Sequence, residues 1–349
     1  MTARPFSRRV RRALARGSPC LLAGLIAASH AARAEPRCLD TAKVCLEARE
    51  TPAGVSFVVA NHEAAPYSAR IVITERENLE PRSPLPFRAV LEPGEERPLG
   101  LLAVRDAAKP TRYAMRWSAA LGVSTARHDA SVRYRMPFGG GEAHRLSQGD
   151  GGASHRGPAI HSLDFEMPWG TPVLAARGGR VVTVVDGLSA GGLRRDLYDQ
   201  ANRVEILHVD GTLATYAHLR QGAAVKVGQQ VATGDLLGYS GDTGYSSGPH
   251  LHFMVWKREA DLSWTSLPVR FFDGTPQGMV PAQGVAYAPA CASTGAGCAP
   301  GETPPAPEPV PAKRADAGAR GLRRTDGACV CGNGAVIYVD LPCEQVCAR

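Results

Sequence analysis

Residues 241–253 are Gly-Asp-Thr-Gly-Tyr-Ser-Ser-Gly-Pro-His-Leu-His-Phe, a glycine-rich turn that leads into an alternating segment. Side chains two positions apart on a β-strand point to the same face. The segment therefore predicts His250 and His252 side by side, with Leu251 in the core. That arrangement fits one metal ligand with a second imidazole beside the metal. Two solvated histidines on an exposed strand are the alternative for the segment taken alone.

Further histidines and an aspartate precede this segment. Seven of the ten histidines lie between 144 and 252, and none follows 252. Asp164 lies in the segment His-Ser-Leu-Asp-Phe, His155 in Ser-His-Arg-Gly, and His218 in Thr-Tyr-Ala-His-Leu. Histidine and carboxylate side chains are common zinc ligands and also common catalytic acids and bases. The sequence therefore predicts a metal or acid–base site in this part of the chain.

A series of short motifs follows in one order over about 120 residues, 138 to 257. In chain order they are Asp164-Phe165 with Gly170–Val173, Ala175–Val181, Asn202–Val204, His208–Thr212, Tyr216–Leu219, Val225–Gly228, Gly234–Gly238 and Gly241–Phe253. In these motifs the sequence resembles the zinc metallopeptidases of the lysostaphin and LytM type, which cut peptide bonds in bacterial peptidoglycan. So many matches in one order make the resemblance specific.

The resemblance implies a role for five side chains. Asp164 and His252 would bind Zn²⁺ together with a histidine of the upstream H-x-G motif, and His218 and His250 would be catalytic histidines that do not bind the metal. Two histidines and one carboxylate leave a coordination position open for water, as in catalytic zinc sites. Zinc lowers the pKa of such a water to about 7 and polarises the scissile carbonyl. Which of the two catalytic histidines takes the proton stays open.

The third zinc ligand is the point at which the sequence departs from the family. The usual pattern is H-x-G-x-D, but here extra residues separate His155-x-Gly157 from Asp164, and His161 stands three positions before Asp164. We assign the ligand to His155, because its segment keeps the H-x-G turn and the extra residues can form a loop. His161 then lies beside the ligands and remains the alternative.

Several other residues that could carry out chemistry are interpreted as structural or exposed residues. Residues 244–248 match the nucleophile pattern G-x-S-x-G, but a proline and a strand follow instead of the helix that this pattern requires. His208 is interpreted as a residue at a strand end and Glu166 as an exposed carboxylate, although Glu166 could also lie beside the metal ligands. His144 has no evident partner in the sequence.

The remaining chain predicts a mainly β protein with several parts. Short alternating runs broken by turn residues predict an immunoglobulin-like β-sandwich over 35–134, a spacer, recognition module or lid. An antiparallel β metallopeptidase domain of LytM type is expected over 135–275. A Pro/Ala-rich linker over 276–325 and a small Cys-rich module over 326–349 are expected to follow.

The N-terminal segment predicts export. A basic stretch, an apolar run from Cys20 to Ala28 and an A-x-A site at 32–34 are typical of a secretory signal peptide over 1–34. The run is shorter than the roughly 20 residues of a membrane-spanning helix. The formal charge is +7, but seven arginines lie before residue 35, which leaves 33 basic and 33 acidic residues. The charge balance therefore gives no support for nucleic-acid binding.

Cysteine content agrees with an oxidising compartment. One of the nine cysteines lies in the signal segment, and the other eight favour disulfide bonds. We expect local closure of Cys38 with Cys45 and of Cys291 with Cys298, and two bridges among the last four cysteines. A zinc site formed by those last four is the alternative, although their spacing lacks C-x2-C pairs.

Together these features predict an exported zinc metalloendopeptidase that hydrolyses peptide cross-links of peptidoglycan, periplasmic or secreted and without stable membrane insertion. The alternative from another class is a non-enzymatic LytM-like protein that binds the cell wall or activates another wall hydrolase. A secreted endopeptidase acting on other proteins would share the same chemistry. The oligomeric state and the bond that is cut stay open.

Overall fold

The computed structural model describes residues 36–39, 42–139 and 141–289 and the backbone of a few short strands outside these ranges. The chain divides into two compact units, one of residues 1–126 with 257–264 and one of 127–256 with 265–349. The protein is mainly β, and its described residues contain no α-helix, only two short 3-10 turns. None of the described segments is a helix with the length and apolar character needed to cross a membrane.

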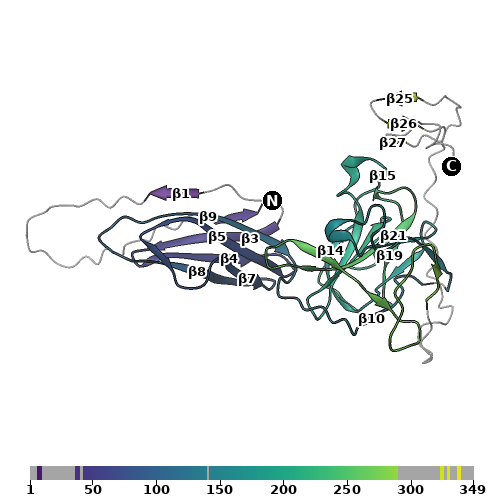
Figure 1. The fold of residues 1–349 in the computed structure, drawn as a ribbon, viewed down its shortest axis with the longest axis horizontal. Helices are drawn as coiled ribbons and strands as arrows, with labels where there is room; N and C mark the ends of the chain where they lie inside the picture. Colours follow the sequence, from purple (N-terminus) through teal and green to yellow (C-terminus); the bar gives the residue numbers. More distant parts are fainter. Residues whose placement is uncertain are drawn as a thin grey trace, which may run out of the picture. The chain divides into compact units, whose positions relative to one another are not determined.

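The first unit contains two antiparallel sheets around one core (Figure 1). In one sheet, β5 lies between β9 and β7, and β1 pairs with the other edge of β9; the second sheet has the order β2-β3-β4-β8-β6. The strands are β1 (Phe6–Arg9), β2 (Arg37–Leu39), β3 (Ala42–Thr51), β4 (Gly54–Asn61), β5 (Tyr67–Glu77), β6 (Leu79–Pro81), β7 (Phe87–Leu91), β8 (Glu96–Val104) and β9 (Arg112–Leu121). The two sheets form a β-sandwich, whereas its immunoglobulin-like classification stays a prediction.

Alternation within the strands explains how this core forms. Val55, Phe57 and Val59 are spaced two apart on β4 and are 5%, 0% and 0% exposed. The Phe57 ring meets Phe87 of the other sheet at a centroid distance of 6.1 Å and Tyr113 at 5.7 Å. Alternate apolar residues therefore point inward from both sheets, as the sequence pattern predicted.

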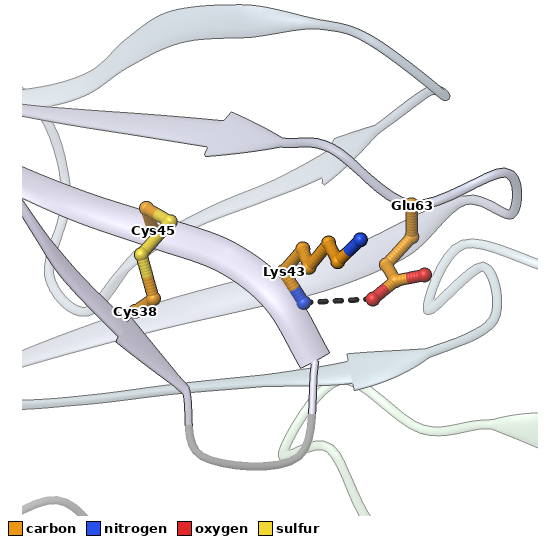
Figure 2. The surroundings of a disulfide bond; sticks show 4 residues. All are labelled: Cys38, Lys43, Cys45 and Glu63. Carbon is orange, nitrogen blue, oxygen red and sulfur yellow. Dashed lines mark hydrogen bonds between the residues drawn. A yellow bond between two sulfur atoms is a disulfide. The ribbon is translucent and has the colours of Figure 1, made fainter.

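A disulfide bond joins Cys38 of β2 to Cys45 of β3, the pair expected from the sequence (Figure 2). In the same region the backbone amide of Lys43 donates a hydrogen bond to Oε1 of Glu63 at 2.7 Å. The other six cysteines expected to pair, the predicted signal peptide and the predicted Cys-rich module lie outside the fully described residues.

The second unit is built around one large antiparallel sheet with the order β18-β14-β16-β17-β21-β12-β11-β24, and β22 pairs with β21. These strands are β11 (His144–Gln148), β12 (Leu163–Glu166), β14 (Gly179–Val185), β16 (Asn202–Leu207), β17 (Leu213–Leu219), β18 (Gln230–Val231), β21 (His250–Arg258), β22 (Trp264–Leu267) and β24 (Ala286–Tyr287). Its core includes the fully buried rings of Phe165, Tyr216 and Phe253.

Three small strand pairs complete the part of this unit that lies within residues 127–289. They are β10 (Arg133–Tyr134) with β23 (Arg270–Phe271), β13 (Pro172–Leu174) with β19 (Leu236–Tyr239), and β15 (Gly191–Gly192) with β20 (Gly244–Tyr245). The β20 segment contains the G-x-S-x-G pattern and leads through Pro249 into β21 instead of a helix. It therefore forms a turn, as expected.

Two expected boundaries differ from the compact units. The second unit begins at Arg127, whose amide donates to the Asp210 carbonyl, seven residues before the expected sandwich ends at 134. Residues 276–289, expected as the start of the linker, instead fold onto this unit. There β24 pairs with β11, and Met279 and Tyr287 pack against the core. The apolar side chains explain this difference, because the Pro/Ala-rich composition begins only near residue 299.

Candidate metal centre

The register of two neighbouring strands brings Asp164 and His252 together. Asp164 of β12 pairs directly with His252 of β21, and the next residues on the same face, Glu166 and His250, also pair. Leu251, between the two histidines, is 0% exposed. Residues opposite one another on adjacent strands share a face, so Asp164, His250 and His252 lie on the face away from the core. The alternation predicted for His250, Leu251 and His252 is present.

His155 reaches the same place from the loop between β11 and β12. Its backbone amide donates to the Gly152 carbonyl at 3.0 Å, and its ring Nδ1 lies 3.2 Å from the Gly149 carbonyl oxygen. A proton on Nδ1 therefore serves this carbonyl and leaves the Nε2 lone pair free, which is the usual arrangement of a metal-binding histidine. The ring is buried, with only 3% of the residue exposed.

The three side chains converge closely enough to hold one metal ion. One ligand atom from each of His155, Asp164 and His252 lies within 4.8 Å of the other two. Nε2 of His155 is 3.1 Å from Oδ2 of Asp164, and Nδ1 of His252 is 2.9 Å from Oδ1 of the same carboxylate. The two histidines contact different oxygen atoms of Asp164, so one carboxylate lies against both rings.

The donor set fits a divalent cation. Nε2 of His155 is buried and lacks a partner in hydrogen-bond geometry, although Asp164 is near. Burial opposes ionisation of Asp164, but its contacts with His155 and His252 outweigh burial and hold the pKa of the carboxyl well below its usual range. A carboxylate ionised at neutral pH beside an unpartnered imidazole nitrogen matches the two-histidine, one-carboxylate set of catalytic zinc sites.

Gln148 supports this cluster and was missed in the sequence. Its Nε2 donates to Oδ2 of Asp164 at 3.1 Å, and its Oε1 accepts from both the backbone amide and the hydroxyl of Ser154, each at 3.0 Å. The side chain thereby links the Asp164 carboxylate to the residue before His155. No motif marks this glutamine, because the contact depends on the pairing of Gln148 with Asp164 between β11 and β12.

His218 and His250 lie next to the cluster and next to each other. Their ring centroids are 4.5 Å apart, and His218 is 5.9 Å from His252. Nδ1 of His218 donates to the Thr243 carbonyl at 2.6 Å, and Nδ1 of His250 donates to the Gly248 carbonyl at 2.8 Å. In each ring the Nε2 atom is therefore the proton acceptor.

The surroundings of His218 favour its neutral form. Burial, followed by the nearby His250 and His252, lowers its pKa to about 3. The residue also has a backbone φ of +62°, in the left-handed region that non-glycine residues seldom occupy. Such strain is often concentrated at functional sites, and here it falls within the last two residues of β17, just before Arg220.

The other candidate residues do not belong to the three-residue cluster and have different partners. Nδ1 of His161 contacts Oδ1 of Asp150 at 2.5 Å, and His161 is not one of the three described residues that converge on the candidate metal position. His208 is buried just beyond β16 with Nδ1 2.9 Å from the Gly178 carbonyl oxygen, and Glu166 is exposed and paired with Arg145. His144 packs edge-on against Phe138, a partner that the sequence did not reveal.

Comparison with known proteins finds a family match over the region of the candidate site. Residues 159–263 match the model of Peptidase family M23. Lysostaphin of Staphylococcus simulans is 32% identical over 162 residues, which are 46% of this chain and 29% of that protein. The peptidoglycan DD-endopeptidase ShyA of Vibrio cholerae is 40% identical over 93 residues, 27% of this chain and 19% of that protein. The matched regions thus span less than a third of either relative.

A solved structure of the catalytic domain of lysostaphin from Staphylococcus simulans is 31% identical, with a TM-score of 0.23, and covers 37% of this chain and 86% of that domain. The matched family range contains Asp164, His218, His250 and His252 but begins four residues after His155, where the sequence carries its extra loop residues. Residues 159–263 form a peptidase domain of family M23, of the lysostaphin and LytM type.

Proposed function

We propose that this chain is an exported zinc metalloendopeptidase that hydrolyses peptide cross-links of bacterial peptidoglycan. The observation that carries the proposal is the convergence of His155, Asp164 and His252 within 4.8 Å, beside the paired rings of His218 and His250. Similarity to relatives named lysostaphin and peptidoglycan DD-endopeptidase supports the substrate class.

Zinc is the metal that the donor set favours. Two imidazoles and one carboxylate are typical of catalytic zinc sites, whereas calcium and magnesium prefer oxygen ligands alone. His155, Asp164 and His252 would hold the ion. When bound, zinc supplies a Lewis acid that polarises a carbonyl and brings the pKa of water near 7.

The two remaining histidines are proposed to move the proton. Because carbonyl oxygens of Thr243 and Gly248 hold the Nδ1 protons of His218 and His250, each ring offers Nε2 as the basic atom. One ring can take a proton from the attacking water at Nε2 and deliver it to the leaving amine. The other ring, with a proton taken up from solvent at Nε2, can donate a hydrogen bond to the oxygen on which negative charge develops.

Export is proposed from the sequence of residues 1–34, with the periplasm or the cell exterior as the destination. A peptidase that cuts peptidoglycan needs to reach the cell wall, so the proposed compartment and the proposed substrate agree. The disulfide between Cys38 and Cys45 is consistent with an oxidising compartment.

Isolated sacculi test this function. We would incubate the mature protein with purified peptidoglycan sacculi and identify released fragments by mass spectrometry. The Asp164→Ala variant and a chelator-treated sample serve as controls. Products formed only by the intact, zinc-loaded protein would support an endopeptidase and name the bond that is cut. Intact sacculi in the presence of a zinc-loaded protein would contradict the proposal.

A further inference from the structure

Arg220 is held between two aromatic rings close to the candidate metal centre. It follows β17 directly and lies two residues after His218. Its guanidinium carbon lies 4.3 Å from the centroid of the Tyr239 ring and 5.2 Å from that of Trp169. Trp169 is 53% exposed, and the cation–π contact with Arg220 gives its ring a partner.

The backbone fixes all three members of this stack. The Arg220 amide donates to the Tyr239 carbonyl at 3.1 Å. The turn that carries Trp169 is bonded to Ser240, the residue after Tyr239. The amides of Gly170 and Thr171 each donate a hydrogen bond to Ser240 at 2.9 Å. Arg220, Tyr239 and Trp169 are therefore positioned by one small region at the end of β19.

The guanidinium has no carboxylate partner within the described part of the chain. Other arginines of this unit do, as Arg177 pairs with Asp210 at 2.8 Å and Arg145 with Glu166 at 3.1 Å. Nε of Arg220 is buried and donates no hydrogen bond to a described residue. A guanidinium stacked between rings keeps its edge available, and that edge matches the two oxygens of a carboxylate.

The position of Arg220 relative to His250 follows from backbone pairing. Gly241 forms an antiparallel bridge with His250. On its other side the same segment pairs with the end of β17, because Ser240 bridges Leu219 and the Tyr239 carbonyl accepts from the Arg220 amide. Residues 239–241 therefore lie between the backbones of Arg220 and His250. Two strand spacings of about 4.8 Å place those backbones roughly 10 Å apart. An extended peptide spans that distance in about three residues.

We propose that Arg220 binds a free carboxylate of the peptide substrate, located within about three residues of the scissile bond. The inference rests on the proposed peptidase function and deepens it. The Arg220 subsite would favour peptides that carry a free carboxylate over otherwise identical neutral peptides. Trp169 and Tyr239 act as positioning residues that hold the guanidinium plane.

Two matched substrates test this subsite. We would compare cross-linked stem-peptide dimers that are identical except that the free carboxyl groups near the cross-link are amidated in one. The zinc-loaded protein is expected to cleave the free-carboxylate dimer with a kcat/KM higher by about 10- to 100-fold, the range for a hydrogen bond to a charged group. The difference should lie mainly in KM, because the carboxylate is bound equally before and during the reaction.

Substitution of Arg220 completes the test. Arg220→Gln should bring the ratio of the two kcat/KM values close to one, and Arg220→Lys should keep an intermediate ratio because it retains charge without the planar fork. The matched control is Arg270→Gln on β23, an exposed arginine that donates to the Gly278 carbonyl, which should keep the wild-type ratio. Thermal unfolding and zinc content would verify that each variant folds.

The outcomes separate this inference from the function on which it rests. Equal cleavage of both dimers by the wild-type protein, or an unchanged ratio in Arg220→Gln, would overturn the carboxylate subsite and leave the peptidase intact. Cleavage of neither dimer would overturn the proposed function. Calorimetric binding of the same two dimers would then test the subsite alone, and equal affinity for both would overturn it.

Discussion

Oδ1 of Asp164 lies 2.9 Å from Nδ1 of His252, and the two residues are direct partners across the antiparallel strands β12 and β21. The register of the sheet therefore sets this contact, since a shift of one residue would turn His252 toward the core. His155 differs, because it reaches the same carboxylate from a loop. Two of the three proposed ligands are thus held by the sheet and one by the loop.

The first prediction concerns that loop. His155→Ala should lose bound zinc, because it removes an imidazole that lies 3.1 Å from the Asp164 carboxylate. The loss should exceed the roughly 10- to 100-fold weakening that follows removal of an outer partner of a ligand. Metal content after dialysis, measured by mass spectrometry of the metal, checks this.

The matched control is His161→Ala, which removes a histidine from the same loop. The His161 side chain contacts Asp150 and not the cluster, so this variant should keep its zinc. Zinc loss in His161→Ala together with zinc retention in His155→Ala would reverse our assignment of the third ligand.

A second prediction concerns Gln148. Its amide donates to the Asp164 carboxylate and accepts from the residue before His155, so Gln148→Ala should weaken zinc binding by about 10- to 100-fold without abolishing it. Competition with a chromogenic chelator measures the affinity. Gln200→Ala, which changes an exposed glutamine bonded to the Asp196 carbonyl, is the control. Equal affinity in both variants would remove Gln148 from the site.

These contacts show which features the sequence predicts and which it does not. The face shared by His250 and His252 follows from a period of two and was predicted. The contact of Gln148 with Asp164 was not, because β11 pairs with β12 through a register shift between Leu146 and Gln148 that no local pattern marks. Arg220 and Trp169 are 51 positions apart, and only the fold brings them together.

Residues 276–289 fold differently from what their composition predicted. Residues 276–325 were expected to form a Pro/Ala-rich linker, but Met279 and Tyr287 pack against the core of the second unit. Isolated apolar residues in an irregular segment carry no periodicity, so their burial depends on surfaces supplied by distant strands. Composition alone therefore predicts burial least well in a segment that has little regular secondary structure.

A third prediction separates proton transfer from metal binding. His250→Ala and His218→Ala should each lower kcat on peptidoglycan fragments by about 10²- to 10⁴-fold, the contribution typical of a positioned acid or base. Both should keep about one zinc per chain, since neither ring belongs to the three-residue cluster. Measured zinc content together with kcat distinguishes these variants from His155→Ala. Full activity in both would leave the ring pair without a catalytic role.

A fourth prediction concerns the pH dependence of stability. Burial lowers the pKa of His208 to about 4 from an ordinary value of 6.5, and the nearby Arg177 and His128 act in the same direction. The Gly178 carbonyl and Asp210 oppose this shift but are outweighed. Between these two values the unfolded chain binds a proton at this site and the folded chain does not. The free energy of unfolding of the second unit should therefore fall as the pH falls from 6.5 to 4.

At 1.36 kcal/mol per pKa unit, the difference between the ordinary pKa of 6.5 and the folded-state pKa of about 4 corresponds to about 3 kcal/mol of the free energy of unfolding. This loss of stability is complete near pH 4. His208→Asn removes the titrating ring and keeps an amide that can donate to Gly178, so its stability should vary less over the same range. Hydrogen exchange of the β16 and β17 amides at several pH values, with chelator present to exclude metal release, measures both proteins. Parallel curves for the two would contradict the assignment, because the difference between them isolates the proton that His208 takes up on unfolding.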